Sequence, residues 1–228
     1  MALAGVNGSG KSTLLALLAG LFPPSEGSLH IVGMDMGKPC EAGKARQSTA
    51  LLLQEADLQI LGNTVGEDLL LSVEAASLQK NSLHPTCPGS AMQGDEAFNP
   101  PKEEDARARA RDFALLDKWN APPHTLSYGQ RRKLCLAGAM LRKPRLLLLD
   151  EPFSGLDYPA VLELCALMLQ YREAGMSIVV SSHDLTPFAP FTDSLLLLSP
   201  DRPPLFGPLR VLAEQCEDWG VRRPVFCE

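Results

Sequence analysis

The chain has 228 residues, 45% of them hydrophobic, with a formal net charge of −6 and a pI near 5.3. Its length and apolar content suffice for one sizeable core, built as one large domain or as a domain with an inserted subdomain. The acidic balance argues against broad electrostatic binding of nucleic acid, which needs clustered Lys and Arg, and no apolar run approaches the roughly 20 residues of a membrane-spanning helix.

A glycine-rich stretch at residues 5–13 predicts a phosphate-binding loop, because it matches the pattern G-x-x-x-x-G-K-[ST] at every fixed position. Apolar residues 1–4 and the leucines that follow supply the expected strand and helix on either side. Glycines let successive backbone N–H groups converge on phosphate oxygens, and the helix N-terminus adds the positive end of its dipole. We therefore expect nucleotide phosphates to bind at Gly5, Asn7, Gly8, Ser9, Gly10, Lys11, Ser12 and Thr13.

Two side chains of this loop have individual chemistry. Lys11 supplies a point charge for the β- and γ-phosphates, and the Ser12 hydroxyl is suited to ligate the Mg²⁺ that bridges them. The alternative is a glycine-rich turn that merely connects a strand to a helix. A Gly-Lys-Ser-Thr run in this context disfavours it.

The next segments predict secondary structure around a long amide. A turn and short strand at 26–33 precede a loop rich in Gly and Lys, after which an apolar strand at 49–53 ends at Gln54. A helix is then indicated by Thr64 as N-cap with Glu67 as its capping-box partner. Prolines and few large apolar residues favour a flexible surface insertion at about 80–104.

A second helix start carries an unusual charge pattern. After an amphipathic helix at 105–116, Ser127 is the natural N-cap of a helix that runs to about residue 141. Arg131, Arg132 and Lys133 occupy its first turn, where the macrodipole disfavours cations unless an anion lies in front. The pattern therefore indicates a phosphate site at this helix start.

Acidic residues end a buried strand further along the chain. The apolar run 146–149 is typical of a strand in a parallel sheet, and it ends in Asp150 and Glu151. Asp150 is suited to hold Mg²⁺, and Glu151 to act as general base for water. A surface turn with two acids is the weaker alternative, since such strands point their ends at the ligand crevice. His183 follows the strand at 177–181, and its position alone leaves a catalytic role open.

The rest of the chain adds a turn at 154–157 before a helix, a last strand at 194–198, a proline-rich segment and a C-terminal helix near 208–218. The six cysteines form no C-x-x-C pair, so we expect reduced thiols without a metal or disulfide role, as in a cytoplasmic protein. No secretory signal is visible.

In this order the motifs resemble those of the ATP-binding cassette (ABC) ATPases, and the resemblance spans nearly the whole chain. It rests on 5–13, Gln54, the Leu-Ser-x-Gly-Gln signature at 126–130, the acids at 150–151, the turn at 154–157, and His183. It implies that two cassettes pack head to tail, so that the signature of one closes over ATP bound to the phosphate loop of the other. The ligands expected are ATP and Mg²⁺.

The resemblance also assigns roles to single residues. Glu151, His183 and Gln54 are the implied catalytic residues, with His183 contacting the γ-phosphate. Mg²⁺ is expected at Ser12, Gln54 and Asp150. The remaining nucleotide contacts are expected from Ser127, Gly129, Gln130 and Asp157. The implied fold is α/β, a P-loop NTPase whose mainly parallel sheet is flanked by helices, with residues 1–62 and 142–228 as catalytic core and 63–141 as an inserted helical subdomain.

Two features depart from the family pattern. Tyr128 replaces the commoner glycine of the signature but leaves Ser127 and Gly129 intact. Family members normally begin with strands that carry an adenine-stacking aromatic residue, and the chain as given starts after them. We therefore expect weak ATP binding with poor discrimination against GTP, and a natural start upstream.

A narrower likeness concerns residues 54–68, which look like the corresponding region of energy-coupling-factor and cobalt or nickel import ATPases. It implies an importer of a metal ion or vitamin, peripheral on the cytoplasmic face of the cell membrane. The expected partners are a second cassette, identical or not, and a multi-spanning membrane subunit, without nucleic acid. The alternatives are a soluble ABC-type ATPase acting on ribosomes or DNA, and an inactive truncated cassette.

Overall fold

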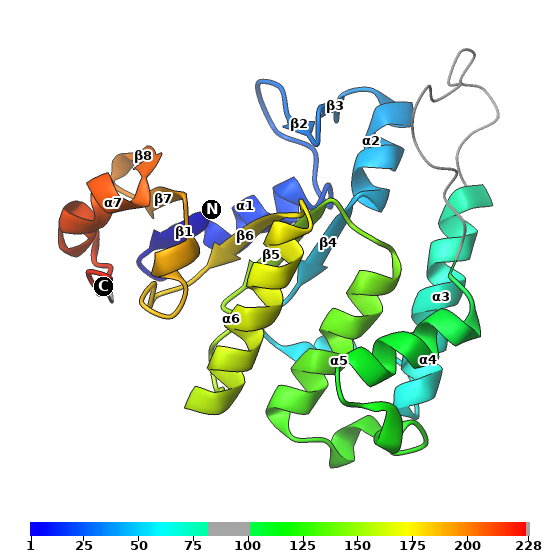
Figure 1. The fold of residues 1–228 in the computed structure, drawn as a ribbon. Coiled ribbons are helices and arrows are strands. Elements are labelled where there is room, and N and C mark those ends of the chain that lie inside the picture. The colour runs from blue at the N-terminus through cyan, green and yellow to red at the C-terminus, as the bar shows by residue number, and fades with distance from the viewer. Residues whose placement is uncertain (82–100, 227–228) are drawn as a thin grey trace. The chain divides into compact units, whose positions relative to one another are not determined.

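A computed structural model describes residues 1–81 and 101–226 (Figure 1). The chain divides into two compact units, which are described separately. The first comprises Met1–Phe22, Leu51–Gln54 and Arg145–Glu228, and the second comprises Pro23–Ala50 and Glu55–Pro144. The predicted insertion at about 80–104 falls mostly outside the described residues, since α3 ends at Asn81 and α4 begins at Glu103.

A six-stranded sheet in the order β4-β5-β6-β1-β7-β8 forms the centre of the first unit. Its strands are β1 (Ala2–Gly5), β4 (Thr49–Leu52), β5 (Leu146–Asp150), β6 (Ser177–Ser181), β7 (Ser194–Ser199) and β8 (Arg202–Pro208). β1 runs parallel to both β6 and β7, β5 runs parallel to β6, and β7 and β8 pair antiparallel. The predicted α/β class with a mainly parallel sheet is confirmed.

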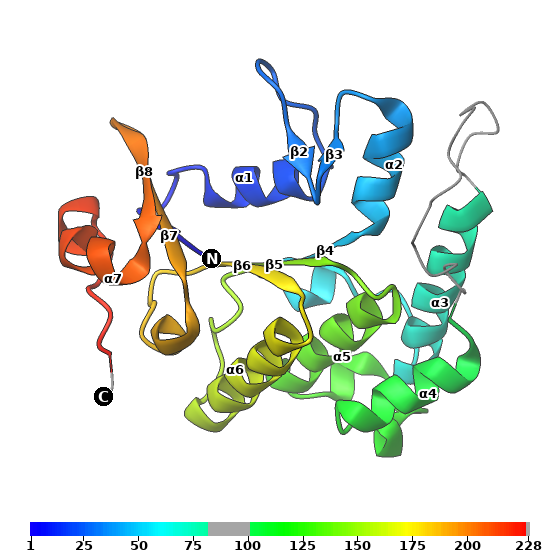
Figure 2. The same cartoon turned by 45° about the horizontal axis from the view of Figure 1, so that its top comes forward.

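Helices cover both faces of this sheet. Helix α1 (Lys11–Leu18) lies on one face and α6 (Tyr158–Glu173) on the other (Figure 2). A 3₁₀ turn η4 (Ala189–Phe191) precedes β7, and α7 (Leu209–Leu212) with η5 (Ala213–Trp219) follows β8. All residues of β1 and β5 are buried, which explains why these strands are apolar on both sides.

The proline-rich segment that follows β7 is itself a strand. It forms β8 at the edge of the sheet, where β7 is its one neighbour among the described strands, and it contains Pro203, Pro204 and Pro208. Proline lacks a backbone N–H, so these residues fit an edge strand and block further pairing along it. The C-terminal helical segment predicted near 208–218 follows as α7 and η5.

The second unit holds a small hairpin and a group of helices. Strands β2 (His30–Ile31) and β3 (Met34–Asp35) pair antiparallel ahead of α2 (Pro39–Gln47). Helices α3 (Val65–Asn81), α4 (Glu103–Asp112) and α5 (Tyr128–Leu141) pack side by side (Figure 1). The 3₁₀ turns are η1 (Ala56–Leu58), η2 (Leu116–Lys118) and η3 (Pro123–Thr125).

The prediction of a loop between the hairpin and β4 is wrong, because α2 occupies most of this segment. Pro39 stands in its first turn with Glu41, and Lys44 and Arg46 lie in its last turn, which suits the helix dipole. Ala42 and Ala45 are buried and anchor the helix. The apolar stripe is made of alanines alone, so the hydrophobic pattern was too weak to predict a helix.

The prediction that the cysteines are reduced thiols is only partly confirmed. Cys135, Cys165 and Cys216 carry free thiols, and burial raises the pKa of Cys135 to about 12 and that of Cys165 to about 11. Cys40, in the first turn of α2, is disulfide-bonded, so the prediction of a reduced thiol is wrong there. Spacing along the chain does not report which cysteines meet in space.

The start of α3 makes a close backbone contact with the segment before the signature. Gly66 donates its N–H to the carbonyl of Trp119 at 2.8 Å, and a methyl group on Gly66 would overlap the Trp119 indole. We expect Gly66→Ala to lower the free energy of unfolding by about 1–3 kcal/mol, the usual cost of overpacking. Urea denaturation measures this. Gly37→Ala is the control, since its methyl group meets only the Asp35 side chain, and an equal loss in both variants would contradict the packing argument.

Candidate functional site

The phosphate loop connects the end of β1 to the start of α1. Gly8 and Gly10 have φ angles of 78° and 95°, a left-handed conformation that glycine adopts without the steric cost of a side chain. At Gly5, any side chain would overlap the Leu198 carbonyl of the neighbouring β7, so the close approach of the two strands requires glycine. The loop geometry therefore explains the three glycines at these positions.

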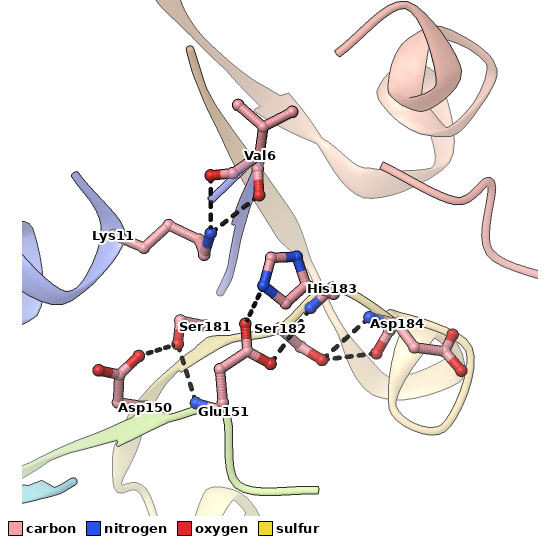
Figure 3. A network of polar contacts seen from close by, with 9 residues as sticks. Val6, Lys11, Asp150, Glu151, Ser181, Ser182, His183 and Asp184 are labelled. Atoms are coloured by element: carbon pink, nitrogen blue, oxygen red, sulfur yellow. Dashed lines mark hydrogen bonds and ion pairs between the residues drawn. The ribbon is translucent and has the colours of Figure 1, made fainter. Parts of the chain in front are cut away.

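Lys11 lies inside this loop rather than in solvent. Its Nζ donates hydrogen bonds to the carbonyl of Gly5 at 2.8 Å and to that of Val6 at 3.1 Å (Figure 3). Its exposed fraction is 7%, and burial lowers the pKa of Lys11, although the charges of Glu151 and Asp150 oppose this shift. The two carboxylates thus favour the charged ammonium, and desolvation strengthens its attraction for an anionic ligand.

Ser181 fixes the end of β5. Its Oγ donates to Asp150 Oδ1 at 2.5 Å, while the backbone N–H of Glu151 donates to both the carbonyl and the hydroxyl oxygen of Ser181 (Figure 3). Asp150 is 7% exposed. Ser181 was not predicted as a site residue, since its only signal in the sequence is its place at the end of the strand before His183.

Glu151 adopts an uncommon backbone conformation. Its φ is 44°, and a non-glycine residue in this region costs of the order of 1–3 kcal/mol. The carboxylate meets His183 twice: Oε1 lies 3.1 Å from Nε2 of the ring, and Oε2 accepts the backbone N–H of His183 at 3.3 Å. The strained turn and these contacts aim Glu151 and His183 at one another (Figure 3).

A cavity of about 220 Å³ in the first unit gathers most of the predicted residues. It is lined by the loop and the first turn of α1, by Gln54, by the acids that end β5, and by His183; the residues are Asn7, Gly8, Gly10, Lys11, Ser12, Thr13, Gln54, Asp150, Glu151 and His183. Gly5 and Ser9 do not line it, but the buried Ser9 hydroxyl has no hydrogen-bond partner among the described residues. The structure therefore brings the predicted catalytic and metal-ligating residues together.

The side chains fit the ligands predicted for this cavity. Mg²⁺ prefers hard oxygen donors. The cavity offers three of them, namely the Ser12 hydroxyl, the Gln54 amide oxygen and the Asp150 carboxylate. Among residues 1–81 and 101–226, no group of three or more His, Cys, Asp or Glu is placed to hold a metal ion. A bound phosphate would add further oxygen ligands, because Mg²⁺ is usually held by one or two carboxylates together with substrate phosphates.

Asp157 has a different place in the same unit. It is the N-cap of α6, and its Oδ1 accepts the N–H of Ala160 at 3.0 Å. It is not among the residues that line the cavity. Its nucleotide contact, implied by the family resemblance, remains a prediction.

The signature residues lie in the second unit, at the start of α5. Ser127 caps the helix as predicted: its Oγ accepts the N–H of Gln130 at 3.3 Å, and the Gln130 side chain accepts the N–H of Ser127 at 3.0 Å. Gly129 lies in the first turn. The capping box fixes the turn locally.

The cations in this first turn have partners within the unit. Arg132, which is 4% exposed, donates to the Tyr128 hydroxyl at 2.8 Å, and Arg131 lies 2.6 Å from a carboxylate oxygen of Asp57. Arg131 therefore has an acidic partner within the unit, and Arg132 has a hydroxyl partner. The phosphate site indicated by sequence at this helix start remains a prediction.

Within the described residues, no helix has the length and apolar character needed to cross a membrane. A family model described as ABC transporter matches residues 1–154. The chain is similar to the cobalt import ATP-binding protein CbiO of Rhodobacter capsulatus, with 35% identity over 94% of this chain and 67% of that protein. It is also similar to the energy-coupling factor transporter ATP-binding protein EcfA2 of Symbiobacterium thermophilum, with 29% identity over 93% of this chain and 68% of that protein.

Among solved structures, the chain is similar to cbiO1 from Clostridium perfringens, described as part of the ABC transporter complex cbiONQ. The TM-score is 0.70 at 27% identity, covering 94% of this chain and 79% of that one. The curated relatives are longer than this chain, which spans 47% of a putative ABC transporter ATP-binding protein of Methanosarcina mazei and 74% of another from Caldanaerobacter subterraneus.

Proposed function

The chain belongs to the ABC transporter family of ATP-binding proteins, and on that premise we propose that it hydrolyses ATP to power a membrane transporter. The observation that carries the proposal is the single cavity that holds Lys11, Asp150, Glu151 and His183. A buried cation for phosphates, a carboxylate for a metal ion and a carboxylate for water are the parts that phosphoryl transfer to water requires.

In this proposal, the backbone N–H groups of the loop and the Lys11 ammonium bind the β- and γ-phosphates of ATP. Ser12, Gln54 and Asp150 would hold Mg²⁺, which supplies positive charge between those phosphates when bound. The Ser181 hydrogen bond keeps Asp150 oriented for this role. Gly5, Gly8 and Gly10 keep the loop open for the phosphates, and Asn7, Ser9 and Thr13 add polar contacts.

Glu151 is the proposed general base. It orients a water molecule and takes its proton as the water oxygen bonds to the γ-phosphorus and the bond to the ADP oxygen breaks. His183 Nε2 lies 3.1 Å from the Glu151 carboxylate, and in this proposal it holds this side chain and contacts the γ-phosphate. The strained φ of Glu151 supports a functional role, since strain of this kind concentrates at active sites.

A second cassette, identical or different, completes the proposed site. The start of α5, with Ser127, Gly129 and Gln130, would face the γ-phosphate of ATP bound to the partner cassette, and Asp157 would contact that partner. In functional terms, we propose that residues 63–141 form the signature subdomain, and 1–62 with 142–228 the catalytic core. The N-cap geometry at Ser127 leaves first-turn N–H groups directed out of the helix, as an anion site needs.

The proposed contact with a membrane subunit lies in the segment that comes after Gln54 in the chain. Leu58 and Leu61 are 67% and 79% exposed, which is unusual for neighbouring large apolar side chains and marks an interaction surface. We propose that they bind the cytoplasmic side of a multi-spanning subunit, which would place the chain peripherally on that face of the membrane. The names of two relatives, one for cobalt import and one for an energy-coupling factor transporter, support the proposal that the transporter imports a metal ion or a vitamin.

A co-purification experiment tests the membrane contact. The chain is co-expressed with a multi-spanning protein encoded next to it and purified in detergent. We expect Leu58→Glu with Leu61→Glu to abolish co-purification, because two charges would be desolvated in the interface, while ATP binding stays unchanged. Val211→Glu is the control, as Val211 is 64% exposed on α7. If the double variant still co-purified with the multi-spanning protein, the proposed contact would be contradicted. If the chain were recovered with ribosomes or DNA instead, the alternative of a soluble ABC-type ATPase would be favoured.

A further inference from the structure

One ion pair joins the segment after Gln54 to the signature helix within the second unit. Arg131 Nε lies 2.6 Å from Asp57 Oδ1, without the alignment of a hydrogen bond. The same guanidinium donates from Nη1 to the Leu126 carbonyl at 2.6 Å. Arg131 thus bridges η1 and the residue immediately before Ser127.

A second contact holds the same two elements together. Cys135, one helical turn beyond Arg131, donates its thiol to the Ala56 carbonyl at 3.4 Å. Burial raises the pKa of this thiol, so it stays protonated and remains a donor. Segment 56–57 is therefore attached to α5 at two successive turns, and a displacement of one element displaces the other.

Tyr128 contributes to the same arrangement. Its hydroxyl accepts from Arg132, and its ring has the Arg132 and Arg131 guanidinium groups at 5.2 Å and 5.9 Å from its centroid. Cation–π contacts of this kind are favourable within about 6 Å. The tyrosine at this signature position thus contacts Arg132 and also Arg131, the arginine that η1 holds.

We propose that Asp57 is a positioning residue for the signature turn. Through Arg131 it holds the Leu126 carbonyl, and thereby the direction in which Ser127 and the first N–H groups of α5 point. Asp57 also offsets a cation that the helix N-terminus would otherwise repel. The inference rests on the proposed function, in which this turn meets the γ-phosphate of ATP on a second cassette.

The test compares Asp57→Ala, Arg131→Ala, the double variant and Asp57→Glu in the full chain. We expect each single alanine variant to lower kcat by about 10- to 100-fold, since a misplacement of about 1 Å can cost about 100-fold. The Kd for ATP measured by calorimetry stays within about twofold, because the phosphate loop is untouched. The double variant is no slower than the slower single variant, as expected for two residues in one link. Asp57→Glu restores most of kcat.

Asp117→Ala is the matched control, an exposed carboxylate in η2 of the same unit. Amide hydrogen exchange adds a readout that does not depend on turnover: residues 127–131 should exchange about tenfold faster in Asp57→Ala and unchanged in the control. Unchanged exchange and kcat in Asp57→Ala, a loss of ATP affinity instead, or multiplicative losses in the double variant would overturn the proposal. A wild-type chain without turnover contradicts the proposed function alone, because the exchange result still decides the role of Asp57.

Discussion

Glu151→Gln is expected to lower ATP turnover by about 10²- to 10⁴-fold, the usual contribution of a general base, while ATP binding survives. The amide keeps the shape of the side chain and still accepts the backbone N–H of His183, so the left-handed turn at Glu151 should persist. Only the ability to take a proton from water is lost. Single-turnover kinetics and calorimetry on the same preparation separate the two effects.

Glu173→Gln is the control for this change, because it makes the same replacement at an exposed position near the end of α6. It should keep wild-type turnover. If Glu151→Gln kept near-normal turnover, Glu151 would not be the base. His183, whose Nε2 lies 3.1 Å from the Glu151 carboxylate, would be the next candidate.

Lys11→Met is expected to weaken ATP binding by about 100-fold or more. Hydrogen bonds to charged groups contribute about 1.5–3 kcal/mol each, and 1.4 kcal/mol corresponds to a factor of ten. The fold should survive, since burial lowers the pKa of Lys11 and thus disfavours the ammonium in the folded state. Methionine fills similar space without that charge. Calorimetry with ATP and urea denaturation measure the two effects, and Lys143→Met is the control at an exposed lysine.

The lowered pKa of Lys11 also predicts a pH dependence with a definite sign. As pH rises, the Lys11 ammonium loses its proton before an ordinary exposed lysine would, and ATP affinity should fall with it. Affinity of Lys11→Met should not show this fall. A wild-type affinity that stays constant up to the ordinary lysine range, or an equal fall in both proteins, would contradict the phosphate-binding role of Lys11.

The cavity could be predicted largely from sequence because its residues sit at strand ends or at fixed spacings. The loop at 5–13 follows a pattern set by phosphate geometry, and Asp150, Glu151 and His183 each follow an apolar strand. Carboxyl ends of parallel strands meet at one edge of a sheet, so their proximity follows from the fold class. The contact between Glu151 and His183, 32 positions apart in the chain, required only that β5 and β6 be neighbours.

Other features could not be predicted because they depend on tertiary contacts without a local signal. The positive φ of Glu151 is held by Ser181, and nothing in a strand-end acid indicates a left-handed backbone. Arg131 contacts Asp57 on η1, and Arg132 contacts Tyr128. The sequence shows this run of cations, but it does not show which side chains contact them in the fold. In β8, prolines argue against a strand unless the segment is already known to form a sheet edge.

Turnover per chain, measured across a dilution series together with the oligomeric state, tests most directly whether two cassettes act together. If the signature of one cassette completes the site of another, the rate per chain falls as dilution separates the subunits, and returns on reconcentration. We expect this fall, with Mg²⁺-dependent activity confined to concentrations at which paired chains are detected. A rate per chain that stays constant down to concentrations where only monomers are present would contradict it.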